Sequence, residues 1–341
     1  MTGIPLRPLA PTDMVQSPEL SRAGAVAPDL PPLPNPISIG WAWLLYLGML
    51  AAAVVGAWLV TGFGSAAHAG SRDTLAEIRQ RGVLVVGVKR DVPLWGQLDP
   101  RTGRLVGLEP DLAADLAARL GVRLELVGLL TAEREPAVEQ RQVDLLLATL
   151  SDTAERRTRM TLVRPHYYAS GVNVLSRRSA RFRAWSDLRN RRVCGRRGAF
   201  YNRPITVSSG MDVVALFDNQ LSIAALREGR CEGLLYDDTS IVAMLQDSAW
   251  SREFEMPLPT LFVTPWSLAI HKEEAGSAFE AFLSQAVIDW HRRGQVADLE
   301  RQWGIPVSAF SARMRTVWRQ RSEQGWFCGE RLTVNTPAEC L

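Results

Sequence analysis

The sequence predicts an α/β fold on a parallel sheet, because apolar strand-like runs alternate with an amphipathic helix. The run Val83–Val88 is rich in β-branched residues and predicts a strand buried on both faces. Pro110 suits a first helical turn, leucines follow at a spacing of four, and Gly121 suits a left-handed C-cap. Val122–Leu126 predicts a second strand by its alternation, and the apolar run Val143–Leu150 predicts a third, buried one.

The loop after Leu150 is the expected binding site, since ligands of open α/β sheets bind outside the carboxyl ends of the strands. Ser151 and Thr153 offer hydroxyl groups, and Arg156 offers a planar fork that can hold a carboxylate by two parallel hydrogen bonds. The alternative is that Asp152 or Thr153 caps a helix and that Arg156 is a solvated surface charge.

Five segments, in their order, resemble the family 3 solute-binding proteins of ABC transporters, the periplasmic receptors for polar amino acids. These segments are GVKRDVPLWGQLDPRTGRLVGLEPDLAADLAARLG, then VDLLLATLSDTAERR, then PHYYASGVNVLSR, then RCEGLLYDD, and finally the stretch from PWSLAIHKE through HRRGQVADLERQWG. The resemblance covers roughly residues 75 to 305. It implies the two-lobe, type 2 periplasmic-binding-protein fold, whose lobes close on the ligand.

Composition divides off the two N-terminal segments, the resemblance implies the two lobes, and the residues beyond the resemblance form a C-terminal extension. A Pro-rich leader spans residues 1–40, a transmembrane helix or long signal anchor 41–64, lobe 1 75–175 and 262–305, lobe 2 176–261, and a C-terminal extension 306–341. The chain is expected to cross into lobe 2 near Gly171–Leu175 and to return near Leu261–Ile270. Phe279–Ile288 and Val296–Trp303 have helical apolar spacing and are expected to complete lobe 1.

The family's site residues carry over onto eight positions. They are Lys89, Trp95, Arg134, Thr149, Ser151, Arg156, Gly198 and Asp237. The resemblance implies that Arg156 clamps the α-carboxylate of the ligand and that Asp237 receives its α-ammonium group. Lys89 and Arg134 favour an acidic side chain, so glutamate or aspartate is the leading hypothesis for the ligand. The alternative is that both cations are exposed and take no part.

Two segments depart from the family's pattern. Trp95 follows Pro93 and Leu94, where the family usually has a second proline and a phenylalanine; its ring is expected against the ligand, with a core or rim position as the alternative. VCGRRGAFYN (Val193–Asn202) lacks the family's small hydroxylated residues. Gly198 can still present backbone amides there, with Arg197 and Tyr201 as weak substitutes for the missing hydroxyls.

An apolar segment precedes the lobes. No Asp, Glu, Lys or Arg occurs between Leu30 and Ser71, and Trp41–Gly62 exceeds the about 20 residues that span a bilayer. We expect a retained anchor in the inner membrane, although Ala67–Ala69 forms an A-x-A-like cleavage site. Positive charges gather after this segment and favour the reverse orientation. The family resemblance therefore decides the expected periplasmic or extracytoplasmic location.

The four cysteines all lie in the expected exported part. Cys194 falls at the end of a strand and Cys231 opens the strand leading to Asp237, so these two form one plausible local pair. Cys328 and Cys340 form the other. Four cysteines allow three pairings, and four free thiols are the alternative.

Composition and motifs give no support to several classes of function. The 341 residues carry a net charge of +3 and no basic tract with interleaved aromatics, so nucleic-acid binding has no support. The four histidines lack metal-ligand spacing, no G-x-S-x-G or P-loop occurs, and no metal or cofactor is predicted. The expected partners are an amino acid and ABC transporter permease subunits. A dehydratase-like enzyme and a membrane-tethered amino acid sensor are the alternatives, with His166 expected to pack rather than react.

Overall fold

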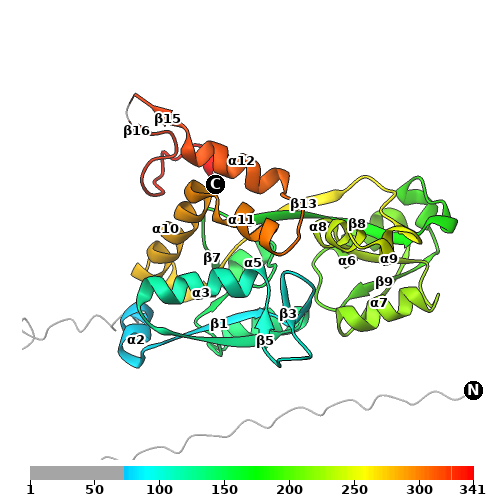
Figure 1. The fold of residues 1–341 in the computed structure, drawn as a ribbon, viewed down its shortest axis with the longest axis horizontal. Helices are drawn as coiled ribbons and strands as arrows, with labels where there is room; N and C mark the ends of the chain where they lie inside the picture. Colours follow the sequence, from blue (N-terminus) through cyan, green and yellow to red (C-terminus); the bar gives the residue numbers. More distant parts are fainter. Residues whose placement is uncertain (1–72, 324) are drawn as a thin grey trace, which may run out of the picture. The chain divides into compact units, whose positions relative to one another are not determined.

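The computed structural model describes residues 73–323 and 325–341 (Figure 1). All of them belong to one compact unit. The expected leader and membrane span lie outside the described residues. Within the described part, no helix is both long and apolar enough to cross a membrane.

Lobe 1 is built on a five-stranded sheet with the order β5, β1, β6, β14, β7 (Figure 1). Its strands are β1 (Val83–Lys89), β5 (Arg123–Leu129), β6 (Leu145–Leu146), β7 (Met160–Leu162) and β14 (Ala269–His271). β1 pairs in parallel with β5 and β6. The predicted parallel sheet is therefore confirmed, and β14 joins it antiparallel to β6 and β7.

The helix predicted after β1 is α3 (Leu108–Leu120), which ends at Gly121 with a left-handed φ of 67°. Leu108, Leu112 and Leu116 are fully buried, because their spacing places them on one face of the helix. α3 packs on β1 and β5. The other helices of lobe 1 are α2 (Thr74–Arg81), η1 (Thr131–Glu133), α4 (Arg134–Glu139), α5 (Ala154–Arg159), η4 (Lys272–Glu274), α10 (Ala278–Arg293) and α11 (Gln295–Gln302). The last two confirm the helices predicted near the end of lobe 1.

The third predicted strand is much shorter than the apolar run Val143–Leu150. Only Leu145–Leu146 pair as β6, because the backbone beyond them bonds to side chains. The Arg134 guanidinium donates to the carbonyls of Ala148 and Thr149, and Glu109 accepts from the Thr149 amide. Beside β1 lies a small sheet of β2 (Asp91–Val92), β3 (Gly96–Leu98) and β4 (Leu105–Val106).

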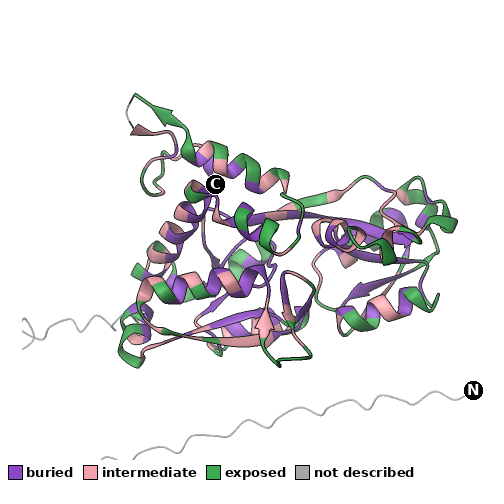
Figure 2. Ribbon diagram, in the orientation of Figure 1, coloured by how far each residue is buried: buried purple, intermediate pink, exposed green. Residues whose placement is uncertain are grey.

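Lobe 2 is built on a second sheet with the order β10, β9, β11, β8, β12, and β13 also pairs with β8. Its strands are β8 (Tyr168–Arg177), β9 (Arg192–Arg196), β10 (Asp212–Leu216), β11 (Gly233–Asp237), β12 (Phe254–Glu255) and β13 (Leu261–Trp266). Its helices are η2 (Arg178–Ala180), η3 (Trp185–Leu188), α6 (Asn202–Ser209), α7 (Asn219–Arg227), α8 (Asp238–Leu245) and α9 (Ser248–Ser251). Figure 2 shows burial concentrated in the strands and on the helix faces turned toward them.

The two strands that connect the lobes, β8 and β13, pair antiparallel with each other. The register between them shifts between Leu261 and Thr264, and Phe262 within this stretch has a φ of 48°. The predicted first crossing lies inside β8. The predicted return is divided into β13 and β14.

A disulfide joins Cys194 of β9 to Cys231, which lies just before β11. β9 and β11 are neighbours in the sheet, with Leu234 paired to Cys194. The predicted pairing is confirmed, and it fastens two adjacent strands of lobe 2.

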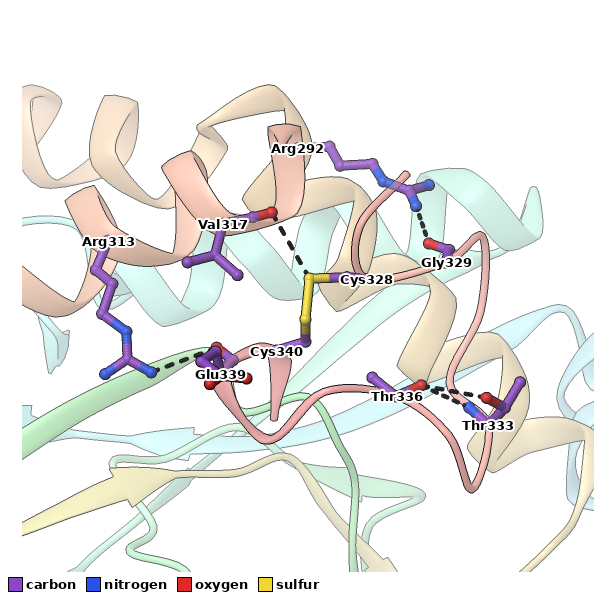
Figure 3. Close-up of a disulfide and its surroundings, with 9 residues drawn as sticks. All are labelled: Arg292, Arg313, Val317, Cys328, Gly329, Thr333, Thr336, Glu339 and Cys340. Carbon is purple, nitrogen blue, oxygen red and sulfur yellow. Dashed lines mark hydrogen bonds between the residues drawn. A yellow bond between two sulfur atoms is a disulfide. The ribbon is translucent and has the colours of Figure 1, made fainter. Parts of the chain in front are cut away.

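The C-terminal extension packs on lobe 1. Its elements are α12 (Ala309–Arg319), β15 (Arg321–Ser322), β16 (Gly325–Trp326) and η5 (Ala338–Cys340). α12 lies against α10, and Cys328 is joined to Cys340, as predicted (Figure 3). Arg292 of α10 donates to the Gly329 carbonyl, and Arg313 of α12 donates to that of Glu339. The disulfide-closed tail is thereby held to two helices.

Candidate functional site

The candidate ligand-binding site is a cluster of buried charged side chains that follow strands of both sheets. Lys89 ends β1, Arg196 ends β9 and Asp237 ends β11. Arg134 and Arg156 belong to α4 and α5 of lobe 1. Because strand ends carry these groups, the site lies where ligands of α/β sheets bind.

Arg156 is held in a defined orientation at the start of α5. Its Nε donates to Glu135 Oε1 at 2.9 Å, and its Nη1 donates to the Ser151 carbonyl at 2.8 Å. The Phe200 ring of lobe 2 lies 5.9 Å from the Arg156 Cζ. Thr153 caps α5 by accepting from the Arg156 amide, so the part of the alternative that assigned it a capping role is confirmed. Arg156 is only 3% exposed, so the alternative of a solvated surface charge is wrong.

Arg134 organises the loop that precedes Arg156. Its guanidinium donates to the carbonyls of Thr131, Ala148 and Thr149 at 2.8 to 3.0 Å. Burial, together with the nearby charges of Arg156 and Arg196, lowers the pKa of Arg134 to about 9. The role of Arg134 toward a distal carboxylate of the ligand stays a prediction.

Lys89 pairs with an acid on the next strand. Its Nζ lies 2.8 Å from Asp91 Oδ1 and donates to the Thr131 hydroxyl at 3.0 Å. Burial lowers the pKa of Lys89 to about 7, against the attraction of Asp91. Lys89 is fully buried and Arg134 is 4% exposed, so the alternative that both cations are exposed is wrong.

Asp237, the expected ammonium acceptor, is bonded to a cation of its own lobe. Arg196 Nη2 donates to Asp237 Oδ2 at 2.6 Å and to the Tyr201 hydroxyl at 2.8 Å. The Tyr236 ring lies 4.3 Å from the Arg196 Cζ. Arg196 and Asp237 are both buried. The neighbouring Arg197, considered from the sequence, is exposed.

Thr149 and Ser151 lie in the loop between β6 and α5. Thr149 has a φ of 48°, which is costly for a β-branched residue and is typical of functional sites. Its amide donates to Glu109 Oε1 at 2.6 Å, and its hydroxyl has no hydrogen-bond partner among the described residues. Ser151 presents its carbonyl to Arg156. Contacts of these two residues with a ligand stay predictions.

Glu109 is a fully buried carboxyl group beneath this loop. Its Oε1 also accepts from the Tyr167 hydroxyl at 2.5 Å. Burial raises the pKa of Glu109 to about 8, despite the hydrogen bonds from Tyr167 and Thr149. Near neutral pH the group is therefore mostly protonated and uncharged.

We expect Glu109→Gln to remove a pH dependence from the stability of the chain. The pKa of Glu109 rises from 4.5 to about 8 on folding, so its stabilising effect is complete below the unfolded pKa and is lost as pH rises through the folded pKa. Between about pH 5 and about pH 8, the free energy of unfolding of the unmodified chain should fall by about 3 to 4 kcal/mol relative to that of the variant. Urea unfolding at both pH values measures this. Glu125→Gln, at an exposed position of β5, is the matched control, and equal pH profiles for the Glu109→Gln and unmodified chains contradict the prediction.

The two lobes contact each other beside the charged cluster. The Asn219 amide, at the start of α7, donates to Asp91 Oδ2 at 3.1 Å, and its side chain donates to the Asp91 carbonyl at 2.9 Å. Gly198 of lobe 2 approaches η1 of lobe 1 so closely that an added Cβ would lie 2.9 Å from the Ala132 Cα. These contacts exist only while the lobes are together.

We expect Gly198→Ala to weaken ligand binding by roughly 5- to 100-fold, because overpacking costs about 1 to 3 kcal/mol and acts here only when the lobes meet. Gly229→Ala is the matched control, since Gly229 has a similar φ of 72° but no atom within 4 Å of its added Cβ. Both variants should lose similar stability from backbone strain. Isothermal titration calorimetry separates them, and equal affinities in the two variants contradict the prediction.

Trp95 lies in an aromatic cluster beneath the site. Its ring centroid is 4.5 Å from that of Tyr168 and 5.0 Å from that of Trp266. Trp95 is fully buried, so its contact with a ligand stays a prediction. His166 Nε2 lies 2.7 Å from Asp152 Oδ2, which fits the expected packing role. In the described part of the chain, no group of His, Cys, Asp and Glu could hold a metal ion.

Sequence reasoning missed four residues of this site. Arg196, Asp91, Asn219 and Glu109 all bond to predicted site residues or join the lobes. Arg196 carried one usable signal, because it lies two residues after Cys194, where a strand was predicted to end, and so would share a face with it if the strand continued. Asn219 and Glu109 carried none, since their contacts come from parts of the chain far apart in sequence.

The comparisons with known proteins agree with this architecture. A family model described as bacterial extracellular solute-binding proteins, family 3, matches residues 84–306. The ABC transporter glutamine-binding protein GlnH of Bacillus subtilis is 21% identical over 245 residues, which cover 70% of this chain and 88% of that protein. The L-cystine-binding protein TcyJ of Escherichia coli K12 is 22% identical over 267 residues, which cover 75% of this chain and 93% of that protein.

A solved structure shows the same fold. The solute receptor for L-cysteine of Neisseria gonorrhoeae matches with a TM-score of 0.63 and 23% identity, over 69% of this chain and 95% of that one. These relatives are named as binding proteins or receptors, in line with the expectation that the chain is not an enzyme.

Proposed function

This chain belongs to family 3 of the bacterial extracellular solute-binding proteins, and from this we propose that it captures a polar, acidic amino acid between its lobes and delivers it to an ABC transporter. The observation that supports the acidic ligand is the buried cluster of four basic side chains. Lys89, Arg134 and Arg156 come from lobe 1, and Arg196 comes from lobe 2. A ligand with two acid groups offers countercharges to both lobes.

Arg156 is the proposed clamp for the α-carboxylate. Glu135 and the Ser151 carbonyl fix two of its nitrogens, so the guanidinium plane is set before the ligand arrives. A planar fork held in this way can form two parallel bonds to a carboxylate. Lys89 and Arg134 are the proposed partners of the side-chain acid group. Thr149, Ser151, Trp95 and Gly198 complete the proposed site.

Capture works through the contacts between the lobes. A ligand shifts the lobes together only if it binds that arrangement more tightly than the open one. Arg156 and Arg196 lie on different lobes, so an acid bound to both favours the contacts of Asp91 with Asn219. The proposed location is the periplasmic or extracytoplasmic side of the inner membrane, where the Trp41–Gly62 segment would anchor the chain beside permease subunits.

A thermal-shift panel on the full chain tests this function. The panel contains glutamate, aspartate, glutamine, arginine and cystine, each at a saturating concentration. A ligand present at a hundred times its Kd stabilises the folded chain by about 2.7 kcal/mol, so glutamate or aspartate should raise Tm by several degrees. A larger shift with glutamine, arginine or cystine contradicts the acidic ligand, and no shift with any amino acid contradicts the function.

A further inference from the structure

Asp237, which is expected to receive the ligand's ammonium group, is already paired with a cation of the protein, Arg196. Arg196 Nη2 lies 2.6 Å from Asp237 Oδ2, and both side chains are buried. An ammonium group that bound the other oxygen of Asp237 would lie beside this guanidinium. It would meet a carboxylate whose charge is already balanced, next to a buried cation that repels it.

Arg196 also has an unused hydrogen-bond donor. Its Nε is buried and has no partner among the described residues. Buried donors in folded proteins are nearly always bonded. The chain fixes the other side of this guanidinium with Tyr201 and Asp237, so the free donor is available to an acceptor such as a carboxylate oxygen.

The other acidic side chains of the cluster are also paired or uncharged. Asp91 is paired with Lys89 and accepts from the Asn219 amide. Glu135 is shared between Arg156 and Arg159. Glu109 is mostly uncharged near neutral pH because burial raises its pKa to about 8. Each charged carboxylate among these residues is therefore already paired with a cation of the protein, whereas Arg156 and Arg196 offer acid groups a cation on each lobe.

We propose that the site recognises small dicarboxylic acids through their two acid groups, and that Arg196, by holding Asp237, removes the requirement for an α-ammonium group. This inference rests on the proposed function, since it concerns the same site. It makes Arg196 the specificity-determining residue of lobe 2. It also makes the amino group of glutamate or aspartate a tolerated substituent rather than a recognised one.

Isothermal titration calorimetry with matched ligand pairs tests the proposal on the full chain. Glutarate is glutamate without its amino group, and succinate is aspartate without its amino group. At least one of the two diacids should bind within about threefold of its amino acid, or more tightly. If both amino acids bind at least about 30-fold more tightly than their diacids, the proposal is overturned and the proposed function stands.

The remaining outcomes are also decisive. Binding of the diacids without binding of either amino acid supports this inference and contradicts the amino acid part of the proposed function. If neither class binds, both fail.

Variants test whether Arg196 sets the preference between glutarate and glutamate. Arg196→Gln should lower glutarate affinity by at least about tenfold and shift the preference toward glutamate, because Asp237 becomes free for the ammonium group. Arg192→Gln changes an exposed arginine at the opposite end of β9 and should leave both affinities unchanged. An Arg196→Gln chain with an unchanged ratio of the two affinities overturns the role of Arg196.

A second variant decides the matter if Arg196→Gln fails to fold. Asp237→Asn removes the carboxylate expected to receive the ammonium group. Under the proposal, glutamate affinity stays within about threefold of the unmodified value, and glutarate affinity is equal or higher. A loss of glutamate affinity of about 30-fold or more, with glutarate affinity unchanged, shows that Asp237 binds the ammonium group and overturns the proposal.

Discussion

Arg156→Ala is expected to weaken binding of the acid ligand by about 100-fold or more, because it removes one partner of a buried, hydrogen-bonded charge pair. Arg156 is buried, and Glu135 and the Ser151 carbonyl hold it in one orientation. The conformational entropy of the guanidinium is therefore lost when the chain folds, and ligand binding does not have to order it again. Isothermal titration calorimetry with glutamate, aspartate, glutarate and succinate measures the loss for whichever ligand binds.

Two further variants separate geometry from charge. Arg156→Lys keeps the charge but cannot form two parallel bonds, so its affinity should fall between those of the alanine variant and the unmodified chain. Arg157→Ala is the matched control, since Arg157 lies on the same helix but bonds to Asp152 and is partly exposed. Equal affinities in the Arg156→Ala and Arg157→Ala chains would show that Arg156 does not contact the ligand.

Cys194→Ala combined with Cys231→Ala is expected to lower the free energy of unfolding of lobe 2 by about 3 to 4 kcal/mol. The two cysteines are 37 residues apart, and closing a loop of this size restricts the unfolded chain by about that amount in the chain-entropy account. Alanine is chosen because both positions are buried. Urea unfolding without reductant, followed by tryptophan fluorescence, measures the loss.

The second disulfide provides the comparison. Cys328 and Cys340 are 12 residues apart and lie in the C-terminal extension, outside both sheets. Their double alanine variant should leave ligand affinity unchanged and loosen only the tail, which limited proteolysis would detect. If the Cys194 and Cys231 variant unfolds at the same urea concentration as the unmodified chain, the disulfide does not stabilise lobe 2.

The elements predicted well from sequence are those whose signals are local. The strand at Val83 and the helix ending at Gly121 depend on periodicity and caps within a few residues. The run Val143–Leu150 failed as a long strand because Arg134 and Glu109 take its backbone groups. Apolar composition predicts burial of such a run, but it does not reveal which side chains replace the sheet's hydrogen bonds.

The sequence supplied candidate residues for the site, but not the way in which their charges are paired. Sequence placed Arg156, Lys89 and Asp237 among the ligand-binding candidates, and the structure adds what each is already bonded to. In lobe 2, two adjacent arginines differ in burial, because Arg196 is the last residue of the buried strand β9 and Arg197 lies beyond it. Arg196 is buried against Asp237, whereas Arg197, just past the end of β9, is exposed.

The paired strands β8 and β13 couple the two connections between the lobes. Since each strand is bonded to the other, neither connection can bend without its neighbour. Their regular pairing is interrupted between Leu261 and Thr264, and such irregularities are where strands bend. A change in the angle between the lobes must therefore deform both strands together.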